Sequence, residues 1–191
     1  MPIFGFRDFD ELLAFHCAPV LMGIKPANLI SLPQIKEQEL KMLLTEYNRQ
    51  FAAQKIVFRQ ICSCNQKRLL LIYQAVELGC LLKNKACRNY LASVGYGRYS
   101  SLEEDLLTLE KRLQYSCEFP HEIGIFLGYP LEDVLGFVIN KGKSCKYSGY
   151  WKVYGDVEQA KRVFAVYEKC RDSILQKLAD GLSLYKAVIT A

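Results

Sequence analysis

The chain has 191 residues, of which 51% are hydrophobic, and its formal net charge at pH 7 is +5. This length suits one domain with an ordinary buried core, and no apolar run approaches the ~20 residues that a membrane-spanning helix needs. The first residues carry acids early and lack the basic-then-apolar pattern of an export signal. We therefore expect one cytoplasmic domain over residues 1–191, without a membrane span.

The first part of the chain alternates helical and extended segments. Apolar spacing predicts a short helix over residues 7–16, which Pro19 stops, and a short strand over 27–32. The stretch 34–58 has leucines and aromatic residues at helical spacing, with polar residues opposite, and this is typical of an amphipathic helix. The short apolar run 68–74 follows a polar turn and is predicted to be a buried strand.

Two further helices are predicted over residues 75–92 and 101–116. The second begins with Ser101 and Glu104 at the spacing of a capping box, in which each residue satisfies a free backbone N–H of the other.

The segment 117–137 is predicted to be a strand that runs into a helix. Residues 122–129 form an apolar run with His121 at its entrance. Pro130 suits the first turn of the next helix, and Gly142 closes that helix.

Next come a strand over 149–154, with period-two alternation, and a long helix that Asp156 caps together with Gln159. Helices outnumber strands, and helical segments separate the predicted strands. This pattern predicts a single α+β (or α/β) domain, in which several amphipathic helices pack on a small sheet of short strands.

The eight cysteines are expected to be free thiols, most of them acting as small buried hydrophobic residues. We expect no disulfide network. The cysteines are Cys17, Cys62, Cys64, Cys80, Cys87, Cys117, Cys145 and Cys170.

Each of the two histidines lies near a cysteine, because His16 precedes Cys17 and Cys117 shortly precedes His121. If the two segments meet in one polar pocket, as we expect, these four side chains suit zinc or iron. Neither segment has the regular pairing of a structural zinc site. The alternative is that His16 lies at a helix C-terminus, where a cation is favourable, and that His121 bonds to backbone at the strand entrance.

A catalytic thiol is the rival hypothesis, because a nearby histidine can lower the pKa of a cysteine. No protease signature surrounds either thiol, and the His-Glu pair lacks the second histidine of H-E-x-x-H, which excludes a zinc protease of that type. The candidate catalytic residues are Cys17, Cys117, His121 and Glu122, with His16 or Asp133 as further partners.

The segment 140–154 alternates lysines with aromatic residues around two glycines, which is typical of a surface that holds a phosphate and stacks on a ring. A basic hairpin whose tryptophan closes the core is the equal alternative. Flavin or nucleotide is a weaker expectation than zinc or iron. The candidate cofactor-binding residues are Lys143, Lys146, Tyr150, Trp151 and Lys152.

Basic residues gather between residues 55 and 98, where Glu77 is the one acid among eight lysines and arginines. A solvated face is the commoner explanation for such a run, although an anionic partner fits it as well. With a modest net charge, a nucleic-acid-binding module is the least favoured hypothesis.

Four stretches resemble one bacterial family, the domain of unknown function 3793: "HCAPVLMGIKPANLISL", "RLLLIYQ", "FPHEIGIFLGYPLEDVLGFVINKG" and "GYWKVYGDVEQAKRVFAVYEKC". The resemblance covers nearly the whole chain and implies a cytosolic protein of anaerobic bacteria, with a flavodoxin-like or iron-handling protein as partner. It carries over no catalytic residue. We therefore favour an accessory protein that binds a ligand, metal or partner in anaerobic redox or iron metabolism, with a cysteine-dependent enzyme as the alternative.

Overall fold

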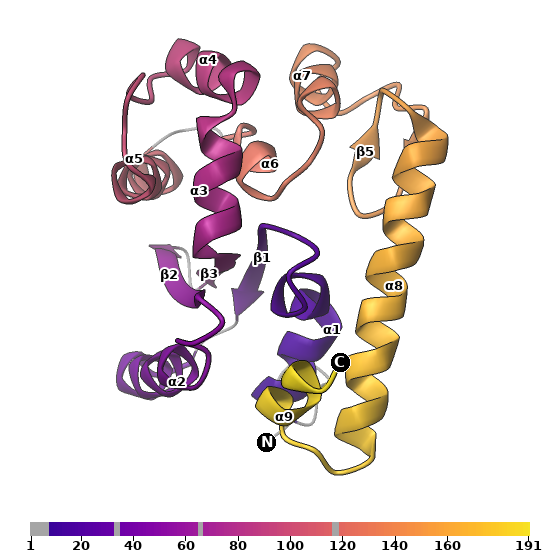
Figure 1. Cartoon of the computed structure of the whole chain (residues 1–191). Coiled ribbons are helices and arrows are strands. Elements are labelled where there is room, and N and C mark those ends of the chain that lie inside the picture. Colours follow the sequence, from indigo (N-terminus) through magenta and orange to yellow (C-terminus); the bar gives the residue numbers. More distant parts are fainter. Residues whose placement is uncertain (1–7, 33–34, 65–66, 116–118) are drawn as a thin grey trace.

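The computed structural model describes residues 8–32, 35–64, 67–115 and 119–191, which form an α+β fold around a three-stranded antiparallel sheet (Figure 1). The strand order is β1 (Ala27–Leu32), β3 (Lys67–Gln74), β2 (Ile56–Cys64). The predicted strands over 27–32 and 68–74 are thereby confirmed. The central strand β3 is apolar from Leu69 to Tyr73, as expected for a strand with helices over both faces of the sheet.

Side chains of β3 alternate between two cores. Leu70 and Ile72 face the first core, and Leu71 and Tyr73 face the second. The first core lies under α1 (Phe9–Leu21), α2 (Glu37–Gln50), the C-terminal half of α8 (Val157–Ala179) and α9 (Leu184–Ile189). The second lies under α3 (Ala75–Lys83), α4 (Lys85–Ser93), α5 (Leu102–Tyr115), α6 (Ile123–Phe126) and α7 (Leu131–Ile139).

The long helix α8 connects these layers to a small hairpin (Figure 1). Its C-terminal half packs on α1, whereas Ala160, Phe164 and Tyr167 in its N-terminal half pack on the hairpin of β4 (Tyr147–Ser148) and β5 (Lys152–Val153). The predicted strand over 149–154 is thus reduced to two residues, paired with Tyr147 and Ser148.

Local caps at two helix starts confirm the sequence prediction. The Ser101 N–H donates to Glu104 Oε2 at 2.7 Å, and the Glu104 N–H donates to Ser101 Oγ at 3.3 Å. At α8, Asp156 Oδ1 accepts from the Gln159 N–H at 2.9 Å. The helix predicted over 75–92 is instead divided at Asn84, whose side chain caps α4.

Two predictions in the first part of the chain are wrong. Helix α1 does not stop before Pro19 but continues to Leu21. Proline is tolerated there because it lies near the end of the helix and removes a single hydrogen bond, to the carbonyl of the exposed residue Phe15. The helix predicted over 34–58 ends at Gln50, and residues 56–64 form β2. Pairing with β3 overrides helical spacing there.

The strand predicted over 122–129 is also wrong, and His121 lies in a turn before the short helix α6. Close packing explains the two glycines of this segment. A Cβ on Gly124 would lie 2.9 Å from the side chain of Val134, and Gly128 has φ +75° with Pro26 against it. The predicted helix after Pro130 is confirmed as α7.

Six cysteines, namely Cys17, Cys62, Cys80, Cys87, Cys145 and Cys170, are free, which confirms the expectation for them. Cys117 lies outside the described residues. Among the helices of the described ranges, none is long and apolar enough to cross a membrane.

Candidate functional site

A buried carboxylate holds the β4–β5 hairpin on α7. Asp133, in the first turn of α7, is 3% exposed. Its Oδ2 accepts from Trp151 Nε1 at 2.7 Å, and its Oδ1 accepts from the Tyr154 and Gly155 N–H groups at 2.7 and 2.8 Å. Three donors replace the water that this anion loses, and they attach the hairpin to α7. Asp133 was a candidate partner for a histidine in the sequence analysis. In the structure its carboxylate instead accepts from Trp151.

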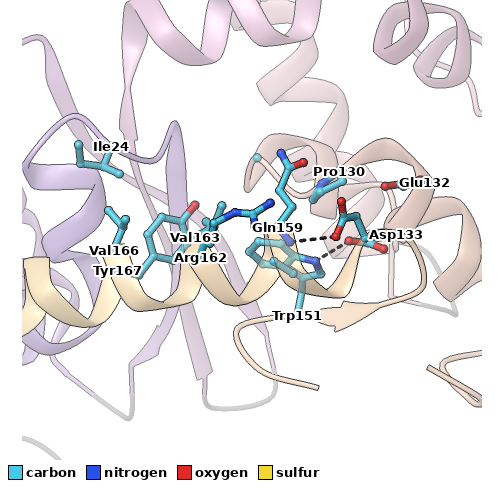
Figure 2. Close-up of a pocket in the computed structure, with 13 residues that line it drawn as sticks. Ile24, Pro130, Glu132, Asp133, Trp151, Gln159, Arg162, Val163, Val166 and Tyr167 are labelled. Carbon is cyan, nitrogen blue, oxygen red and sulfur yellow. Dashed lines mark hydrogen bonds between the residues drawn. The ribbon is translucent and has the colours of Figure 1, made fainter. Parts of the chain in front are cut away.

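The indole of Trp151 is a wall between two cavities. It stacks on Tyr129 at 5.0 Å between ring centroids and meets Phe164 edge-on at 4.5 Å. Trp151 and Asp133 both line each cavity. Figure 2 shows the larger cavity, with a dashed line between Trp151 and Asp133.

The smaller cavity, which we call the His121 pocket, has a volume of about 370 Å³ and mainly apolar walls. The His121 ring lies 5.0 Å from the Phe137 ring. Lys152 Nζ lies 5.8 Å from the centroid of Phe137 and donates to the Gly142 carbonyl at 2.5 Å. The pocket is lined by Leu29, Phe119, His121, Ile123, Gly124, Leu127, Tyr129, Asp133, Val134, Phe137, Trp151 and Lys152.

The larger cavity, the α8 cleft, has a volume of about 720 Å³ and lies along the N-terminal half of α8 (Figure 2). One part of it is apolar, formed by Ile24, Val166 and Tyr167, and the other carries Glu132 and Arg162. It has opposite charges on its wall and no aromatic enclosure comparable to that of the His121 pocket.

The predicted cofactor residues divide into two groups. Trp151 and Lys152 line the His121 pocket, together with His121. Lys146 instead ties the hairpin together, because its Nζ donates to the Gly155 carbonyl at 3.0 Å. Tyr150 packs on Phe164 and Tyr167 of α8, and the backbone carbonyl of Lys143 accepts from Tyr154.

Of the pocket expected from His16, Cys17, Cys117, His121 and Glu122, Cys117 lies outside the described residues, and Cys17 and Glu122 have other partners. Glu122, 4% exposed, pairs with Arg112 and accepts from the Tyr96 hydroxyl at 3.2 Å. His16 is exposed, and partial desolvation of its ring lowers its pKa. Among the described residues, no three His, Cys, Asp or Glu side chains are grouped to hold a metal ion.

Lys25 is a buried lysine that the sequence does not predict, because nothing in "GIKPAN" distinguishes it from a surface lysine. Lys25 is 3% exposed, and its Nζ donates to Asn28 Oδ1 at 2.6 Å. The ammonium also lies 5.4 Å from the ring centroid of Tyr129 and 5.7 Å from that of Tyr167. Burial lowers the pKa of Lys25 to about 8. Lys25 thus lies beside Tyr129, the residue that stacks on Trp151.

Cys17 occupies the same buried region. It is fully buried, and its Sγ lies 3.9 Å from Asn28 Nδ2. Burial raises the pKa of the Cys17 thiol to about 12, although Asn28 and Lys25 partly oppose this shift. A nucleophilic cysteine needs the opposite shift.

The fold and the site define a small α+β protein with a ligand-sized aromatic pocket beside a buried Asp–Trp pair. The chain belongs to the family described as "Protein of unknown function (DUF3793)", whose model matches residues 13–188. This agrees with the family that the sequence resembles. Comparisons with curated proteins and with solved structures gave no match.

Proposed function

We propose that this protein is a non-catalytic accessory protein that binds a planar, largely apolar molecule with an anionic group in the His121 pocket. The observation that carries the proposal is the convergence of His121, Trp151 and Lys152 on one apolar cavity of about 370 Å³. Ligand pockets are commonly apolar cavities of ~300–1,000 Å³ with a few polar groups that orient the ligand.

The chemistry of the lining supports this ligand class. Phe137 and the indole of Trp151 offer apolar aromatic surface to a planar ring. Lys152 supplies a cation beside that surface, held in place by the Gly142 carbonyl. A carboxylate, sulfonate or phosphate on the ligand would therefore be drawn to Lys152, while the ring fills the apolar part.

Cys17 gives no support to the alternative of a cysteine-dependent enzyme, because burial keeps its thiol protonated. We retain as proposals the cytoplasmic location and the flavodoxin-like or iron-handling partner that the family resemblance implies. The described residues offer no grouped ligands for iron or zinc, so a metal is not included in the proposed site.

Two fluorescent probes test the pocket. We expect 8-anilinonaphthalene-1-sulfonate to bind with a stoichiometry of one and to quench Trp151, the single tryptophan of the chain. Lys152→Met should lower the affinity for this anionic probe by about tenfold, since a charge-assisted contact contributes about 1.5 kcal/mol. The uncharged N-phenyl-1-naphthylamine should keep its affinity.

Phe137→Ala should lower the affinity for both probes, because it removes an apolar wall of the pocket. Matched controls are Lys169→Met and Phe15→Ala, which change exposed residues outside both cavities. If the Lys152 and Phe137 variants bind both probes as the controls do, the proposed ligand site is wrong.

A further inference from the structure

A third cavity, of about 580 Å³, lies at the junction of α3 and α4 and shares no lining residue with the cavities beside Trp151. It is formed by the end of α3, the start of α4 and the loop that leads to α5. We call it the Lys83 cleft. Its lining contains four basic residues and no acid: Lys83, Lys85, Arg88, Asn89, Arg98, Tyr99 and Ser100.

Three of the four cations are not neutralised. Arg88 forms a buried ion pair with Asp105, whose side chain is 1% exposed. In the described ranges, no acid pairs with Lys83, Lys85 or Arg98, all of which are exposed. Like charges gathered around one concave surface repel one another, and a bound anion would remove that repulsion.

The buried guanidinium of Arg88 fixes both walls of this cleft. Its Nε donates to the Leu82 carbonyl at 3.0 Å, directly before Lys83. Its Nη1 donates to the Gly97 carbonyl at 3.0 Å and to Ser100 Oγ at 2.9 Å, on either side of Arg98 and Tyr99. The backbone beside Lys83 and Arg98 is therefore held by hydrogen bonds, which lowers the entropy cost of ordering this loop on binding.

Tyr99 stands at the same cleft with 94% of its surface exposed. A tyrosine ring that follows Arg98 on this loop offers a stacking surface for a base. The N-terminus of α4 adds the positive end of its helix dipole at Lys85. Asn84 already occupies the N–H groups of Ala86 and Cys87, so the anion would be held by the side-chain cations.

We propose that the Lys83 cleft binds a nucleoside di- or triphosphate, with the phosphates on Lys83, Lys85 and Arg98 and the base on Tyr99. Three cations match the charge of such a polyphosphate, and the cleft, of about 580 Å³, is large enough for one such molecule. The acid Glu104, in the first turn of α5, closely follows the loop and would repel a longer polyanion.

Calorimetric titration at low salt tests this proposal with ATP, tripolyphosphate and adenosine. We expect ATP to bind with a stoichiometry of one and adenosine not to bind. The double variant Lys83→Gln/Lys85→Gln should lower the affinity for ATP by at least about tenfold. The matched control, Lys41→Gln/Lys169→Gln, removes two exposed lysines elsewhere and should leave ATP affinity unchanged.

Tyr99→Ala separates the two parts of the ligand. This variant should lower the affinity for ATP by about tenfold, because the stacking contact is lost, and leave the affinity for tripolyphosphate unchanged. The proposal is overturned if ATP does not bind, or if both double variants lose affinity equally. It is also overturned if Tyr99→Ala has no effect on ATP, or if a single-stranded oligonucleotide displaces ATP with higher affinity.

Discussion

The indole N–H of Trp151 donates to the buried carboxylate of Asp133 at 2.7 Å, and the same carboxylate accepts two backbone N–H groups of the hairpin. One side chain of α7 thereby sets the position of the wall that divides the His121 pocket from the α8 cleft. The stability of the hairpin and the shape of the pocket consequently depend on the same three hydrogen bonds.

Asp133→Asn should lower the free energy of unfolding by about 2–3 kcal/mol, because the new amide NH₂ faces donors and leaves at least one buried N–H unsatisfied. The emission of Trp151 should shift to longer wavelength as water reaches the indole. Urea unfolding followed by fluorescence measures both effects. Glu168→Gln removes one exposed charge from α8 and should change neither. Equal stability of the two variants would contradict the role given to Asp133.

Lys25→Met should alter the pH dependence of stability. The pKa of Lys25 is lowered from 10.5 to about 8 in the folded protein. Between these values the unfolded chain binds a proton that the native protein lacks, so Lys25 makes stability rise with pH in that window. Below pH 8 its unfavourable contribution is constant. The unfolding free energy of Lys25→Met minus that of the wild type should therefore be about 3 kcal/mol larger at pH 7.5 than at pH 10.5.

Urea unfolding of both proteins at the two pH values measures this difference. Cys17 acts in the opposite direction, because its raised pKa makes stability fall as pH rises from 9 toward 12. Both proteins retain Cys17, so its effect largely cancels in the comparison. Lys169→Met, at an exposed site, should show no pH-dependent difference. A constant difference for Lys25→Met would mean that this lysine keeps an ordinary pKa.

Alkylation should separate the cysteines by burial. At pH 8.5 the rise in pKa from 9.0 to about 12 lowers the thiolate fraction of Cys17 by about a thousandfold, and the side chain is also inaccessible. Brief treatment of the native protein with iodoacetamide, followed by peptide mass spectrometry, should label the exposed Cys80 and spare Cys17. In urea both should react. Rapid labelling of Cys17 in the native protein would instead support Cys17 as a reactive thiol.

Gly128→Ala should destabilise the fold more than the same change at Gly181. Both glycines have positive φ, +75° and +88°, so each alanine introduces backbone strain of about 1–2 kcal/mol. A Cβ at Gly128 would also lie 2.5 Å from Pro26 Cγ, whereas at Gly181 nothing lies within 4 Å. We expect Gly128→Ala to cost at least about 2 kcal/mol more in unfolding free energy. Equal costs would show that the contact with Pro26 relaxes easily.

The sequence by itself determined the elements whose signals are local. The capping box at Ser101 and the cap at Asp156 need only residues within one turn, so α5 and α8 begin where expected. The buried strand β3 is also local, because a continuous apolar run suits a strand covered on both faces. The chemical character of His121, Trp151 and Lys152 is also local, and it is enough to make them candidate binding residues.

Only the tertiary structure decided β2, the short helix α6 and the partners of the buried charges. Residues 56–64 have apolar positions that fit a helix or a strand, and pairing with β3 selects the strand. Glu122 pairs with Arg112, and Lys25 lies between Tyr129 and Tyr167, rings far along the chain. Such contacts depend on how distant elements pack, and burial raises the cost of any charge left without a partner. No spacing within a short segment encodes that choice.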